Sequence, residues 1–116
     1  MATNGNRRRP KAPVPLLELD TTEGEAREVA TEPILKRDGV VYTIPAKVSA
    51  DVALQYMELA VSVGPGEALM WAMKRLMGTD GYTALATFPN LTDAELGKIT
   101  NYIQAKISGA WGSPKA

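Results

Sequence analysis

The pattern of apolar and polar residues predicts a β-hairpin near residue 40. Residues 34–37 begin with Ile34 and Leu35, residues 40–44 are apolar and rich in β-branched side chains, and Asp38-Gly39 separates the two segments. This dipeptide favours a two-residue type I′ turn, because both central positions need a positive φ angle. The register then pairs Leu35 with Tyr42. The expected buried face consists of Leu35, Tyr42 and Ile44. A lone hairpin is not stable in water, so helices should cover this face.

The spacing next predicts two helices joined by a short break. The first runs from about residue 50 to 63, with Ser49 as its N-cap. Its polar residues recur every three or four positions and form one narrow stripe: Asp51, Gln55, Glu58 and Ser62. The rest of its surface is apolar, so it is either central or faces a partner. The second helix is predicted over 65–77, with Gly78 after its last residue.

Two more helices complete the predicted body. A short one over 80–88 should pack Tyr82, Leu85 and Phe88. The last begins with a capping box, Thr92-Asp93-Ala94-Glu95, and should end near residue 109 or 112. Its apolar row is Leu96, Ile99, Ile103 and Ile107. The expected fold class is mainly α: a small N-terminal β-hairpin followed by a compact bundle of about four helices.

The chain divides into three predicted parts. Residues 1–32 have few large apolar side chains, too few to offset an ordering entropy of roughly 1–2 kcal/mol per residue, so we expect a disordered charged tail. This tail begins with a basic cluster, Arg7-Arg8-Arg9 and Lys11, and contains an LLEL stretch at Leu16–Leu19 that a partner could order. Residues 33–112 form the folded domain, and 113–116 are a C-terminal tail. Because so small a domain is marginally stable, we expect it to associate with copies or partners.

Composition argues against an enzyme. The chain has no cysteine and no histidine, which removes disulfides, Cys-His or Ser-His-Asp catalysis and the commonest metal ligands. The acidic residues of the folded part each suit a turn, a cap or a polar stripe, so no catalytic, cofactor or metal site is predicted. No apolar run approaches the ~20 residues of a membrane span, and no signal peptide is recognisable.

Nucleic-acid binding is a weaker interpretation. Thirteen basic and thirteen acidic residues give a net charge of zero, which supplies little affinity for phosphates. Asp93 and Glu95 at the start of the last helix would repel DNA. A DNA-binding regulator therefore remains only as an alternative.

A protein-binding helical module fits the composition better. Met is adaptable and frequent at binding surfaces, and Trp is enriched at interface hot spots. The candidate partner-binding residues are Met57, Met70, Trp71, Met73, Met77 and Trp111. Each also has a structural alternative: the methionines could fill gaps in the core, Trp71 could cover a neighbouring loop, and Trp111 could cover the core.

Several segments together resemble a known family. They are RDGVVYTIPAKVSADVALQYMELA, a Gly/Pro break, a Trp-bearing helix that ends LMGTDGYTAL, and NLTDAELGKITNYIQ. This pattern is similar to the tail assembly chaperones of long-tailed (siphovirus) phages that infect actinobacteria. The similarity covers roughly residues 34–107. Val48-Ser49 stands where these proteins usually have a proline after the P-A-x stretch.

The resemblance implies a function and partners. Such chaperones coat the tape measure protein, keep it soluble and recruit the major tail protein. They act in the host cytoplasm and are absent from the mature virion. A programmed −1 ribosomal frameshift yields a second, longer product, so this chain would be the shorter one. Ser113-Pro114-Lys115 can be encoded by a slippery heptamer, which makes it a hypothetical frameshift site. The alternative is a small phage adaptor or scaffold-like protein.

Overall fold

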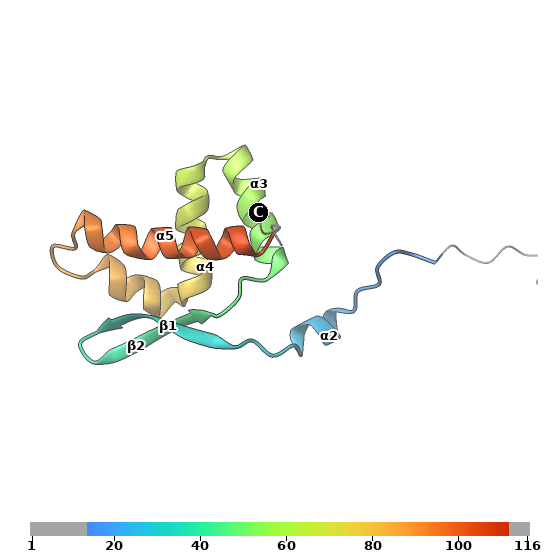
Figure 1. The fold of residues 1–116 in the computed structure, drawn as a ribbon, viewed down its shortest axis with the longest axis horizontal. Helices are drawn as coiled ribbons and strands as arrows, with labels where there is room; N and C mark the ends of the chain where they lie inside the picture. The colour runs from blue at the N-terminus through green and yellow to red at the C-terminus, as the bar shows by residue number, and fades with distance from the viewer. Residues whose placement is uncertain (1–13, 112–116) are drawn as a thin grey trace, which may run out of the picture.

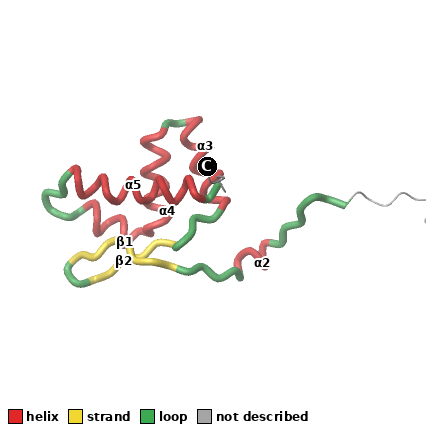
Figure 2. Tube along the Cα trace, viewed as in Figure 1, coloured by secondary structure: helices red, strands yellow, loops and turns green. Residues whose placement is uncertain are grey.

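The computed structural model describes residues 14–111. Its elements are α2 (Thr21–Glu25), β1 (Thr31–Arg37), β2 (Val40–Pro45), α3 (Ala50–Ser62), α4 (Pro65–Ala86) and α5 (Asp93–Gly109). The fold is mainly helical with an N-terminal antiparallel hairpin, as predicted (Figures 1 and 2). The expectations for the basic cluster at residues 7–11 and for residues 113–116 lie outside the described range.

The β1–β2 hairpin confirms the predicted turn and register. Asp38 and Gly39 have φ angles of 51° and 82°, as a type I′ turn requires, and Leu35 pairs with Tyr42. The structure adds an irregularity between Pro33 and Leu35, which lets two successive side chains turn inward. The strand also begins at Thr31, three residues before the predicted run. β1 therefore includes residues 31 and 32, which the sequence pattern places at the end of the tail.

α3 and α4 pack against each other and are joined at Gly64, where the sequence predicts the break. Ser49 occupies the N-cap position of α3, but its side chain makes no capping bond. Its hydroxyl instead donates a hydrogen bond to the Asp51 carboxylate, which lowers the pKa of Asp51. The sequence thus predicted the position of the cap but not the bond that the serine makes.

Gly78 divides α4 into the two predicted helices. Its φ of 76° and ψ of 170° are not helical, and only glycine adopts this conformation without strain. The helix resumes after it and ends at Ala86, two residues before the predicted end. Phe88 therefore lies outside the helix and is 42% exposed, which corrects the expectation that it packs inside.

The core lies where the hairpin, α3, α4 and α5 meet. Ile44 of β2, Val52 of α3 and Ile103 of α5 are its most completely buried large side chains. α5 packs against both α3 and α4, and it crosses α4 (Figure 1). Its capping box is present, since the Glu95 amide donates to the Thr92 hydroxyl at 3.1 Å and the Thr92 amide donates to the Glu95 carboxylate at 3.0 Å.

Residues 14–30 leave the folded body as an extended arm. All of them are exposed, and they contain the short helix α2, which Asp20 caps. The arm departs from the start of β1 and points away from the body (Figure 1). The LLEL stretch lies on this arm, with its leucine side chains exposed.

Candidate protein-interaction surface

One outward face of α3 is apolar. Leu54, Met57 and Val61 are 60%, 46% and 84% exposed, and their spacing of three and four residues places them in one row. We call this row the α3 stripe. The polar stripe that begins at Asp51 runs beside it, while Val52 and Ala53 face the core. α3 is thus apolar on two sides, one buried and one open to solvent.

An apolar groove of about 310 Å³ lies between α4 and α5. We call it the α4–α5 groove. Met70 and Leu96 line it from opposite helices and are both exposed, and Met73 and Leu91 contribute to the same groove. Its polar neighbours are few, so it can accept an apolar side chain.

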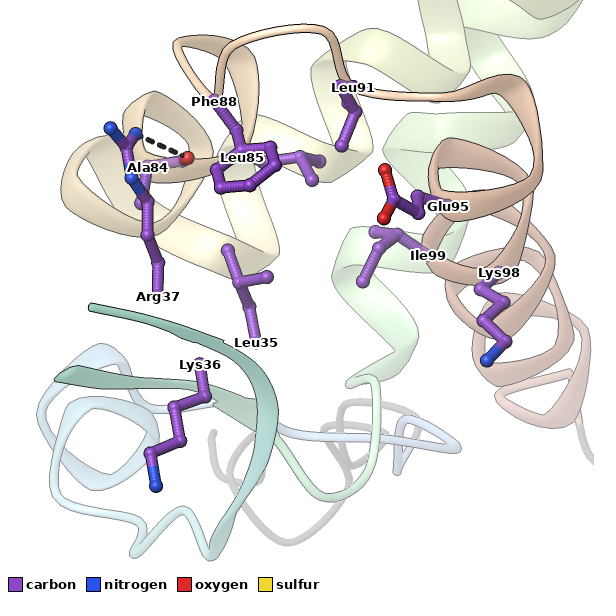
Figure 3. A pocket seen from close by; sticks show the side chains of 10 residues that line it. All are labelled: Leu35, Lys36, Arg37, Ala84, Leu85, Phe88, Leu91, Glu95, Lys98 and Ile99. Carbon is purple, nitrogen blue, oxygen red and sulfur yellow. Dashed lines mark hydrogen bonds between the residues drawn. The ribbon is translucent and has the colours of Figure 1, made fainter. Parts of the chain in front are cut away.

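A second apolar cavity of about 250 Å³ lies between β1 and the ends of α4 and α5 (Figure 3). We call it the hairpin pocket. Its apolar wall consists of Leu35, Ala84, Leu85, Phe88, Leu91 and Ile99. Lys36, Arg37 and Lys98 lie around it, against a single acid, Glu95. The hydrogen bond from the Thr92 amide lowers the pKa of Glu95, so that carboxylate is ionised and already partnered.

The structure separates the predicted partner-binding residues into two groups. Met57 lies on the α3 stripe and Met70 lines the α4–α5 groove, and both are exposed. Met73 and Met77 are only 6% and 5% exposed and belong to the core. Met77 packs the interior, and Met73 is buried but also lines the α4–α5 groove, so contact of either residue with a partner stays a prediction.

The two tryptophans also differ. Trp71 is half-buried and lies beside Glu58, Leu59 and Ser62 of α3, so it covers a neighbouring helix and not the loop that the structural alternative expected. Trp111 is exposed beyond the end of α5. Neither tryptophan lines the α4–α5 groove.

Sequence reasoning missed several exposed apolar side chains. Leu54 and Val61 share the row of Met57, and their spacing in the sequence was the available signal. Phe88 and Leu96 were expected to pack inside and instead border the two cavities. The candidate surface is therefore built more from leucine, valine and phenylalanine than from methionine and tryptophan.

Within residues 14–111, no three Asp, Glu, His or Cys side chains are grouped so that they could hold a metal ion. No helix in that range is both long and apolar enough to span a bilayer. No protein-family model matches the chain, and neither a curated protein nor a solved structure is similar to it. The exposed apolar surfaces are thus the main features from which a function can be argued.

Proposed function

We propose that this protein is a tail assembly chaperone of a long-tailed phage that binds the tape measure protein and keeps it soluble. The proposal is supported by the resemblance of residues 34–107 and, above all, by the α3 stripe, whose three apolar side chains lie open on a well-packed helix. Solvent-exposed apolar rows of this kind are typical of surfaces that receive another protein.

The stripe has the geometry that a helical client needs. A tape measure protein is a very long helix with exposed apolar rows, and apolar residues spaced three and four apart on two helices interlock. Leu54, Met57 and Val61 provide such a row, and the neighbouring polar stripe limits the contact to one side. The α4–α5 groove, with the flexible side chain of Met70 at its edge, can accept further apolar side chains.

The energetics favour binding by many copies. Burial of the exposed parts of these three side chains contributes about 4 kcal/mol. Association of two proteins costs about 4–15 kcal/mol in lost translational and rotational freedom, so one stripe alone binds a client weakly. Several copies bound along one client gain by multivalency, and each copy still leaves readily. Weak individual contacts suit a chaperone that must be released when the tail tube assembles.

The proposal includes a cellular setting. The protein acts in the host cytoplasm, is absent from the mature virion, and works with a longer frameshifted product that recruits the major tail protein. It needs no cofactor and performs no catalysis. If the protein is instead a small adaptor or scaffold-like component, mass spectrometry of purified virions will detect it.

Co-expression with the tape measure protein tests this function. The double variant Leu54→Glu/Val61→Glu changes two exposed positions, so the fold should persist while the client becomes insoluble. The matched control is Gln55→Glu/Ser62→Glu, which adds the same charge to the polar stripe of the same helix. Equal solubility of the client with all three proteins would refute the role of the α3 stripe.

A further inference from the structure

We propose that the LLEL segment of the N-terminal arm, Leu16–Leu19, docks into the hairpin pocket of a second copy of the chain. This inference concerns self-association and does not rest on the proposed function. Both halves of the contact are exposed in the structure: the leucines of the arm on one side and the apolar wall of the pocket on the other. Docking would bury the apolar surface of both the arm and the pocket.

The shape of the segment fits the pocket. Leu17 and Leu19 lie outside any helix or strand, and in an extended chain residues two apart point to the same side. An apolar cavity of about 150 Å³ is large enough for benzene, so the hairpin pocket of about 250 Å³ has room for these side chains. Leu35, Phe88 and Ile99 provide an apolar wall for them (Figure 3).

The charges are complementary as well. Residues 14–30 carry five acidic side chains and one arginine, and Glu18 and Asp20 directly flank Leu19. The pocket is surrounded by three basic side chains and one acid. Lys36 and Lys98 are exposed at its edge, where the flexible side chain of lysine can reach a carboxylate of the bound arm. An acidic and leucine-rich segment is therefore a better occupant than a basic one.

The direction of the arm favours a second copy over the same chain. The arm leaves from Thr31, at one end of β1, whereas the pocket is formed around Leu35–Arg37 at the other end. The arm continues away from the body, so reaching its own pocket requires a reversal of the chain (Figure 1). An arm that reaches the pocket of a neighbouring molecule needs no such reversal. Because arm and pocket are different surfaces, each copy can use both and extend a row of copies.

Sedimentation of the full-length protein over a range of concentrations tests the contact. Wild type should associate as its concentration rises, and Leu17→Asp/Leu19→Asp should weaken this association about a hundredfold, because each buried leucine contributes roughly tenfold. Lys98→Glu should weaken it too, whereas Lys47→Glu, an exposed lysine away from the pocket, should not. Association that is unchanged in Leu17→Asp/Leu19→Asp would overturn the proposal.

Disulfide trapping distinguishes a second copy from the same chain. The protein has no native cysteine, so Leu19→Cys and Lys98→Cys provide unique thiols. Mixing the two variants should give a covalent dimer of one of each, and Lys47→Cys should not replace Lys98→Cys. If a chain with both cysteines at 19 and 98 instead closes on itself at high dilution while the mixture gives no dimer, the arm occupies its own pocket and the proposal is overturned.

Discussion

The Glu32 carboxylate of β1 lies 2.8 Å from the Lys106 ammonium of α5 and forms an ion pair with it. Tyr102 donates its hydroxyl hydrogen to the same carboxylate, and Lys106 also donates to the Ala46 carbonyl. This cluster joins the last helix to the first strand and to the loop after β2. It stabilises a contact between the two ends of the folded domain.

The cluster makes stability depend on pH. The hydrogen bond from Lys106 is the main cause that lowers the pKa of Glu32, and the same bond raises the pKa of Lys106. The stabilisation by Glu32 is therefore present above the ordinary carboxyl pKa and is lost as pH falls through the lowered one. The stabilisation by Lys106 is lost only as pH rises through the raised pKa of Lys106, in the alkaline range.

Glu32→Gln should reduce this acid dependence. We expect wild type to lose more free energy of unfolding between pH 7 and pH 3 than Glu32→Gln does, as measured by urea denaturation at both pH values. Glu28→Gln, on the exposed arm, should behave like wild type. Equal losses in wild type and Glu32→Gln would contradict a role for the ion pair.

Gly78→Ala should destabilise the protein by about 1–3 kcal/mol, because its φ of 76° and ψ of 170° strain any residue with a Cβ. Space is not the reason, since an added Cβ at Gly78 would meet no atom within 4 Å. Gly97→Ala is the matched control. Gly97 lies inside α5, and an added Cβ there would also meet no atom within 4 Å, so alanine should stabilise the protein by about 1 kcal/mol. Thermal or urea unfolding measures both changes in stability. Changes of the same sign in the two variants would contradict the kink in α4.

Arg37→Met should lower the free energy of unfolding by about 1–3 kcal/mol, measured by urea denaturation. The Arg37 guanidinium donates to the Ala84 carbonyl at 2.9 Å and to the Thr87 hydroxyl at 2.8 Å, and it thereby holds the end of α4 against the hairpin. Lys36→Met alters an exposed neighbour and should change stability by less than about 0.5 kcal/mol. A similar effect of both substitutions would show that the Arg37 hydrogen bonds contribute nothing specific.

Leu54→Glu/Val61→Glu should leave stability within about 1 kcal/mol of wild type, because both side chains already face solvent. Met73→Glu should instead unfold the protein, since it places a charge in the core. Circular dichroism during thermal unfolding measures both effects. A large loss of stability in the double variant would mean that the α3 stripe packs within the fold.

Local signals in the sequence were sufficient for much of the fold. Asp38-Gly39 determines the turn and its register, Thr92 and Glu95 mark the start of α5, and Gly78 interrupts α4. Each of these features depends on residues close in the chain. The early start of β1 did not follow from the sequence, because Thr31 and Glu32 pair with β2 only across the irregularity between Pro33 and Leu35.

The candidate surface was harder to predict for a physical reason. α3 has one narrow polar stripe, and on the rest of its circumference the side chains are apolar, so its pattern does not reveal which apolar side is buried. Only the packing of α4 and α5 decides that Val52 is inside and Leu54 is outside. The residue type alone likewise could not distinguish the exposed Met70 from the buried Met77.

Site-specific photo-crosslinking during co-expression tests the central claim most directly. A benzophenone amino acid at position 57, on the α3 stripe, should form an adduct with the tape measure protein, and the same group at position 55, on the polar stripe, should not. No adduct from position 57, or an equally strong one from position 55, would contradict binding through this face.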